Sequence, residues 1–167
     1  MKSNNYIKQL FQKYRNKGIL IDTNILLLWC VGSTNRDRIS KFNRTETFIP
    51  EDYDTLLKVL QCFSQIVTTP NILTEVNSLV NQIGEPDRTR CLVTLAEGIT
   101  MLKEFYLPSE NVVKVDKYIK FGLTDSGIIE LSRDKYLVLT DDLRLATYLQ
   151  SLGIDTVNFN HIRVYGW

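Results

Sequence analysis

A carboxylate interrupts the most hydrophobic part of this chain. The segment KGILIDTNILLLWCVG covers residues 17–32, and Asp22 stands between its two apolar runs. An unpaired carboxylate in an apolar interior is costly, so such a group usually has a partner. Two interpretations follow. Asp22 caps the helix that begins after it, or it holds a metal ion.

Other acidic residues follow predicted strands. Asp141 and Asp142 come directly after the apolar segment YLVLT, residues 136–140, and Glu75 lies about one helical turn after the short strand IVTT, residues 66–69. Asp125 stands at the start of another predicted helix. Each acid alone has a simple explanation, because Asp is a common helix N-cap.

Together these acids predict a metal site. Ligands of open parallel sheets bind beyond the carboxyl ends of the strands. We therefore expect four carboxylates to converge there: Asp22, Glu75, Asp125 and Asp142. They would repel one another unless a divalent cation neutralised them, and hard oxygen ligands suit Mg²⁺ or Mn²⁺.

The elements that must position these acids alternate between short apolar strands and helices. The expected strands are 18–22, 66–69, 136–140 and 155–159, and the expected helices are 4–16, 24–31, 52–66, one from 70, 86–105, 111–120, 124–132 and 142–153. This alternation predicts an α/β fold with a central parallel sheet between two helical layers, a three-layer α/β/α domain. We expect one domain over residues 1–167, with a helical extension at 1–17 and a basic loop at 33–50.

Positive charge is concentrated near the N-terminus. Residues 1–44 hold nine basic and two acidic side chains, net +7, whereas the rest of the chain is net −6. Such asymmetry can mark a surface that faces nucleic acid. The chain has no apolar signal-peptide core and no segment long enough to span a bilayer, which predicts a cytoplasmic protein. Its three cysteines, in apolar surroundings, are expected to be reduced.

Four segments, taken in order, resemble the motifs of the PIN domain family, whose members are metal-dependent nucleases. They are ILIDTNILL, TPNILTEV, GLTDSGIIELS and LVLTDDLRLA, and the resemblance covers roughly residues 18–158. It implies that Asp22, Glu75, Asp125 and Asp142 form the family's acidic quartet. It also implies that Asn24 and Thr140 are supporting polar residues, with Asp141 adjacent to a motif position.

The resemblance implies an activity and partners. We expect Mg²⁺- or Mn²⁺-dependent hydrolysis of RNA by a metal-activated water, which leaves 5′-phosphate and 3′-hydroxyl ends. The largest group of the family is the VapC-type bacterial toxins, so an antitoxin protein and a homodimeric state are also implied. The helix at 4–16 and the basic loop at 33–50 are longer than in compact toxins of this type.

Two other interpretations compete with the nuclease. A haloacid dehalogenase-like phosphatase also places an Asp at a strand end, but it needs a second Asp two residues later, where this chain has Asn24. A non-catalytic PIN-like module that binds RNA is the second alternative. The presence of all four acids argues against a degenerate site.

A nearly neutral protein with an acidic pocket needs a basic surface to hold RNA. The segment RDRISKFNR leaves the helix that begins just after Asp22, so we expect it to lie near the pocket. Its basic residues, the predicted phosphate contacts, are Arg36, Arg38, Lys41 and Arg44. Phosphate contacts position a nucleic acid without reading its sequence.

Overall fold

A five-stranded sheet organises the fold in the computed structural model, which describes residues 2–165. The strands are β1 (Ile19–Ile21), β2 (Ile66–Thr68), β3 (Lys103–Glu104), β4 (Leu137–Thr140) and β5 (Thr156–Asn158). They lie in the order β3-β2-β1-β4-β5, and every pairing is parallel. The predicted α/β fold with a central parallel sheet between helical layers is confirmed.

The side of the sheet on which strands are added changes at β1. From β1 the chain adds β2 and β3 on one side, and later β4 and β5 on the other. Leu20 in the central strand pairs with Val67 of β2 and Val138 of β4. Parallel connections are almost always right-handed, so connections that run in opposite directions place their helices on opposite faces. The junction of β1 and β4 is therefore the topological switch point of the sheet.

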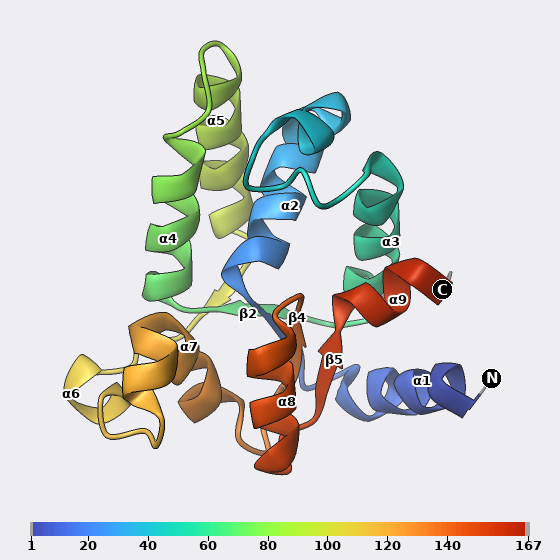
Figure 1. The fold of residues 1–167 in the computed structure, drawn as a ribbon, viewed down its shortest axis with the longest axis vertical. Coiled ribbons are helices and arrows are strands. Elements are labelled where there is room, and N and C mark those ends of the chain that lie inside the picture. The colour runs from blue at the N-terminus through green and yellow to red at the C-terminus, as the bar shows by residue number, and fades with distance from the viewer. Residues whose placement is uncertain (1, 166–167) are drawn as a thin grey trace.

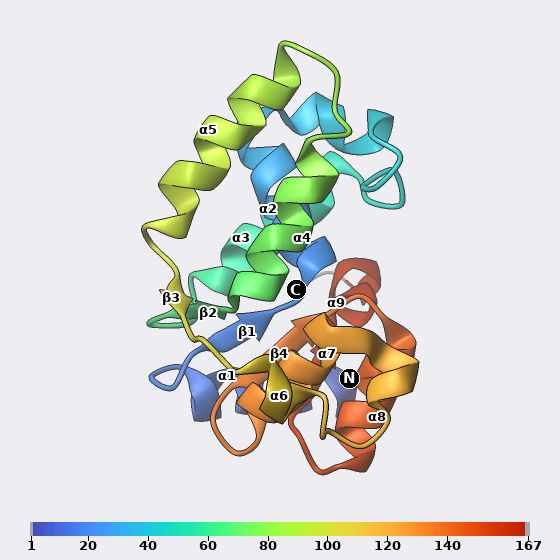
Figure 2. The ribbon, with the colours of Figure 1, turned by 90° about the vertical axis from the view of Figure 1, so that its left-hand side faces the viewer.

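Nine α-helices and one 3₁₀ helix surround the sheet in the described part of the chain. They are α1 (Lys2–Tyr14), α2 (Thr23–Thr34), the 3₁₀ helix η1 (Arg36–Lys41), α3 (Pro50–Leu60), α4 (Pro70–Val80), α5 (Asp87–Ile99), α6 (Ser109–Val112), α7 (Tyr118–Ser132), α8 (Leu143–Ser151) and α9 (Phe159–Tyr165). Helices α2, α4 and α5 stand side by side in the upper half of Figure 1, and α7 and α8 lie in the lower half. Figure 2 shows the same division from the side.

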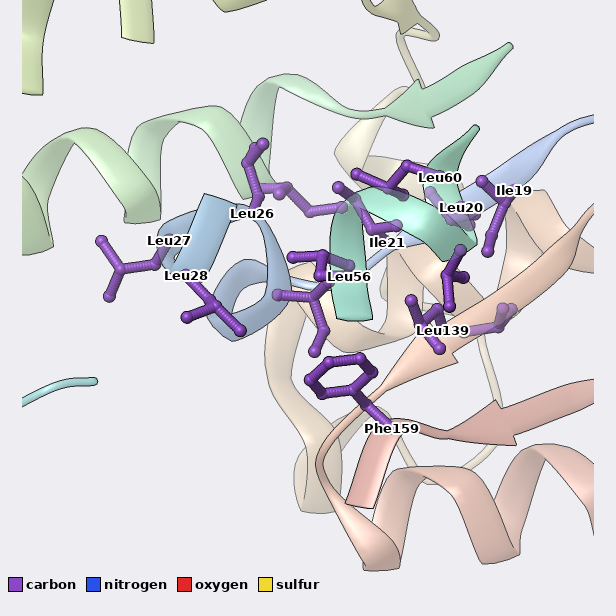
Figure 3. Close-up of a cluster of buried hydrophobic side chains, with 14 of the residues drawn as sticks. Ile19, Leu20, Ile21, Leu26, Leu27, Leu28, Leu56, Leu60, Leu139 and Phe159 are labelled. Atoms are coloured by element: carbon purple, nitrogen blue, oxygen red, sulfur yellow. The ribbon is translucent and has the colours of Figure 1, made fainter. Parts of the chain in front are cut away.

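The apolar sequence of β1 follows from burial on both faces. Ile19, Leu20 and Ile21 are at most 1% exposed, as expected for a central strand of a parallel sheet. Figure 3 shows these residues with Leu56 of α3 and Phe159 in one buried cluster. Burying one such side chain stabilises the fold by about 1.5–3 kcal/mol. This cluster fixes the strand whose end carries Asp22.

The predicted basic loop at 33–50 is only partly a loop. Helix α2 continues to Thr34 and η1 covers 36–41, whereas residues 42–49 form turns without helix or strand. Ile39 and Thr45 are completely buried, and Phe48 is nearly so. The apolar residues within this polar segment anchor it to the core, and the Thr45 hydroxyl donates to the Ile39 carbonyl at 2.7 Å.

Other predicted boundaries also change. The helix expected over 86–105 ends at Ile99, and the exposed two-residue strand β3 follows it. The helix expected over 111–120 is the single turn α6, and α9 was not predicted. Helix α1 packs its apolar side chains into the common core rather than extending away from it. Among residues 2–165, none of the helices is both long and apolar enough for a membrane span.

Candidate active site

A polar pocket of about 230 Å³ lies where β1 and β4 end, at the switch point of the sheet. The side chains that line it are Asp22, Thr23, Asn24, Glu75, Leu79, Asp125, Asp142 and Leu145. The structure thus brings together the four acids of the predicted quartet. They come from four separate segments, following β1 and β4 and within α4 and α7.

Asp22 is the most buried of the four acids, at 6% exposure. Its Oδ1 accepts a hydrogen bond from the Ile25 N–H at 2.9 Å, so Asp22 is the N-cap of α2. Its Oδ2 accepts from the Thr140 hydroxyl and from the Asp141 N–H at 3.3 Å. The capping interpretation is therefore confirmed, and it leaves Asp22 on the wall of the pocket.

Burial dominates the electrostatics of Asp22. The pKa of Asp22 is raised to about 8, mainly by desolvation. The negative charge of Asp141 is the next cause, and that of Asp125 has a smaller effect. The hydrogen bonds from Thr140 and from the Ile25 N–H act in the opposite direction without outweighing burial. Asp22 forms no ion pair with any residue of the part of the chain that the structure describes.

Asp125 follows a break in α7. Gly122 has φ 77° and ψ −175°, a conformation that interrupts the helix and starts a new turn just before Asp125. Burial raises the pKa of Asp125 to about 6, and the charges of Asp142 and Glu75 add to this effect. The nearby Arg144 guanidinium acts in the opposite direction. Asp125 is thus electrostatically coupled to two other acids of the quartet.

Two threonines that the sequence analysis did not single out fix Glu75. Its Oε1 accepts a hydrogen bond from the Thr124 hydroxyl at 2.6 Å, and its Oε2 accepts from the Thr23 hydroxyl at 2.7 Å. This carboxylate therefore links α4 to α2 and α7. Each threonine is next to a quartet acid in the sequence, and this position is the feature of the sequence that could have indicated its place in the pocket.

Asp142, rather than its neighbour Asp141, lines the pocket. The Oδ1 of Asp142 caps α8 by accepting from the N–H groups of Arg144 at 2.7 Å and Leu145 at 3.1 Å. Asp141 accepts from the Asn24 side-chain amide at 3.1 Å, and burial raises its pKa. Thr140 therefore contacts a quartet acid, Asp22, as predicted, whereas Asn24 contacts Asp141, which is outside the quartet.

The donor chemistry of the pocket suits a hard divalent cation, because carboxylate and amide oxygens dominate its lining. The arrangement is less closed than a formed metal centre. Across residues 2–165, no three His, Cys, Asp or Glu side chains are placed to hold one ion. The hydrogen bonds to Asp22, Glu75 and Asp142 explain this, since they direct carboxylate oxygens toward threonine hydroxyls and backbone N–H groups.

The basic segment is not beside this pocket. Asp22 caps the first turn of α2, whereas η1 follows its last turn, as Figure 1 shows. A helix of 12 residues is about 18 Å long. The expectation that residues 36–44 lie near the pocket is therefore wrong, because α2 carries the chain away from the sheet.

Most of the predicted phosphate contacts already have protein partners. The pairs are Arg36 with Asp54 at 2.6 Å, Arg38 with Asp87 at 3.5 Å and Arg44 with Gln82 at 3.0 Å. Lys41 is exposed. An arginine that is paired with a carboxylate presents less net charge to a phosphate, so the formal +7 overstates the attraction of this region.

Neither a scan against protein-family models nor a search of curated proteins finds a match to this chain.

Proposed function

We propose that this chain is a PIN-type endoribonuclease that depends on Mg²⁺ or Mn²⁺. One observation carries the proposal: four carboxylates from four distant segments line one pocket at the switch point of a parallel sheet. Structural reasons alone do not favour this arrangement, because like charges in a partly buried pocket raise one another's pKa. Perturbed acids in a pocket are typical of functional sites.

The roles of the residues follow from their contacts. Asp22, Asp125 and Asp142, with Glu75, would hold the cation through carboxylate oxygens. A bound Mg²⁺ or Mn²⁺ supplies an acidic water and stabilises charge on a phosphodiester. The Thr140 hydroxyl and the Ile25 N–H orient Asp22 by hydrogen bonds.

Asp125 is suited to holding the cation. In its absence, burial and the charges of Asp142 and Glu75 raise the pKa of Asp125 to about 6. A bound divalent cation would lower the pKa of this carboxyl and favour its charged form, which is the form that binds the ion.

The resemblance in sequence supports the finer parts of the proposal. It favours RNA as substrate, products with 5′-phosphate and 3′-hydroxyl ends, and a homodimer regulated by an antitoxin protein. The cysteines Cys30, Cys62 and Cys91 are free thiols, which suits a cytoplasmic enzyme.

The test is cleavage of a fluorescent single-stranded RNA in Mn²⁺, in Mg²⁺ and in EDTA. Asp22→Asn keeps the size and the helix cap but removes the charge, so it should reduce cleavage by about 100–1,000-fold, as loss of one transition-state interaction can. The matched control is Asp37→Asn, which removes one exposed carboxylate beyond the far end of α2. Full cleavage in EDTA or by Asp22→Asn would contradict the metal mechanism.

The same preparations separate the two competing functions. A haloacid dehalogenase-like phosphatase would hydrolyse p-nitrophenyl phosphate in an Asp22-dependent way and leave RNA intact. The hydrogen bonds to both oxygens of Asp22 do not favour such a nucleophile. A non-catalytic RNA-binding module would bind the RNA and cleave it under none of these conditions.

A further inference from the structure

A second hollow lies between α7 and α8. Its volume is about 440 Å³, and the residues that line it are Lys120, Leu143, Arg144, Thr147, Tyr148 and Ser151. We call this surface the α8 groove. Its lining contains two cations and no acid. The two hollows share no lining residue, but they approach each other in the chain, because Leu143 and Arg144 of the groove directly follow Asp142 of the pocket.

The two cations of the α8 groove are available to a ligand. Lys120 and Arg144 are both exposed, and neither forms an ion pair with another residue in 2–165. Arg36 and Arg38, by contrast, are both paired with carboxylates. Arg144 is also close enough to the acidic pocket to act on Asp125. A phosphate on Arg144 would therefore be near the proposed cleavage site.

Aromatic and apolar side chains lie between these cations. The rings of Phe121 and Tyr148 stack with centroids 5.0 Å apart and planes 25° apart. The Lys120 ammonium is 5.1 Å from the centroid of the Phe121 ring. The Tyr148 hydroxyl donates to the Asp116 carbonyl at 3.3 Å, which fixes the ring, and Leu143 is 62% exposed. A fixed ring beside free cations is typical of single-strand binding surfaces.

We propose that the α8 groove guides single-stranded RNA into the acidic pocket, with Lys120 and Arg144 on its phosphates and Tyr148 and Leu143 against a base. This inference rests on the proposed function and names where its substrate binds. The acidic pocket repels a polyanion, so the attraction must come from a neighbouring surface. The α8 groove includes Arg144, which is near enough to act on Asp125 of the pocket, whereas the segment 36–44 is at the other end of α2.

The test compares two double variants that remove the same charge. Lys120→Gln with Arg144→Gln changes the α8 groove, and Arg36→Gln with Lys41→Gln changes the far segment. All are made in the Asp22→Asn background, and binding of a fluorescein-labelled single-stranded RNA is measured in EDTA at several KCl concentrations. The groove variant should bind at least about tenfold more weakly, with a salt slope lower by about 0.7 for each lost contact.

Three outcomes would overturn the inference. They are equal binding by both double variants, a loss confined to the far-segment variant, and no binding of RNA by the background protein at low salt. Thermal melting of every variant establishes that the fold is kept. If binding depends on the α8 groove but the wild-type chain cleaves no RNA in Mn²⁺, the groove stands and the nuclease proposal fails.

Discussion

The two ends of helix α2 handle charge in opposite ways. At its N-terminus, Asp22 is buried with no cation near enough for an ion pair in the described chain, and only hydrogen bonds satisfy it. Beyond its C-terminus, Arg36 and Arg38 are partly or fully exposed, yet each is within 4 Å of a carboxylate. Opposite charges are thus paired beyond the C-terminus of α2, whereas the carboxylate at its N-terminus has no ion-pair partner within residues 2–165.

This difference shows that availability of charge, rather than its amount, identifies a binding site. The sequence concentrates a net +7 in residues 1–44, but Lys13, Arg36 and Arg38 form ion pairs within the fold. Lys13, for example, contacts Asp155 at 2.6 Å. Asp22 and Arg144 carry more functional information because neither forms an ion pair within residues 2–165.

After the loss of Asp22 itself, the largest expected effect comes from removing the hydroxyls that hold Glu75. Thr23→Val together with Thr124→Val removes both hydroxyls that hold Glu75, while keeping side-chain size. Partners that orient metal ligands typically contribute 10–100-fold, so we expect cleavage in Mn²⁺ to fall by about that factor. The control is Thr55→Val on α3, whose hydroxyl donates only to the Glu51 carbonyl. Unchanged rates in the double variant would mean that Glu75 needs no fixed orientation.

A second effect concerns stability and pH. The pKa of Asp22 is about 8 in the folded chain and near 3.8 when unfolded. Between these values the folded chain keeps a proton that the unfolded chain has released, so the stability contributed by Asp22 falls as pH rises. Asn resembles the protonated form and does not titrate. In EDTA, Asp22→Asn should therefore melt at a higher temperature than wild type at pH 8.

The gain in melting temperature of Asp22→Asn over wild type must depend on pH. We expect the difference in melting temperature between Asp22→Asn and wild type to be small at pH 5 and to reach several degrees at pH 8, at about 2–4 °C per kcal/mol. Asp37→Asn, an exposed acid, should show no such growth. If the difference in melting temperature stays constant or shrinks as pH rises, burial does not raise the pKa of Asp22.

The same comparison explains what the sequence could predict. Short runs of apolar residues in the sequence identify β1 and β4. The parallel sheet then places Asp22 and Asp142 at the same edge. β3 could not be found, because Lys103 and Glu104 are exposed and carry no apolar signal. The fold of residues 36–48 was also missed, because it depends on isolated side chains such as Ile39 rather than on a periodic pattern.

Contacts between distant segments were the other gap. The sequence places Arg36 in a basic segment but does not show that Asp54 pairs with it. It likewise does not show that Thr23 and Thr124 meet at Glu75. Residue types predict what a group can do, whereas its partners depend on the tertiary fold.

A third prediction concerns a largely buried ion pair, Asp52 with Arg163. Asp52 is 5% exposed, and it accepts from Arg163 at 2.8 Å and from the Ile49 N–H at 2.9 Å. Arg163→Gln leaves that carboxylate with a weaker partner, so we expect a loss of about 1.5–3 kcal/mol in the free energy of unfolding. Urea denaturation measures this loss. A change below about 0.5 kcal/mol would mean that the N–H alone satisfies Asp52.

The smallest effect is expected at the paired basic end, from Arg36→Gln. Its ion pair with Asp54 is short, at 2.6 Å, but the two side chains are 48% and 44% exposed. Solvent and salt screen such a pair, and holding both side chains costs entropy, so its loss should change the free energy of unfolding by about 0.5 kcal/mol or less. The double variant with Asp54→Asn isolates the coupling between the two groups. A coupling energy above about 1 kcal/mol would show that ion pairs, rather than buried residues such as Ile39, hold this end of α2. Charged groups would then be important for the structure at both ends of the helix.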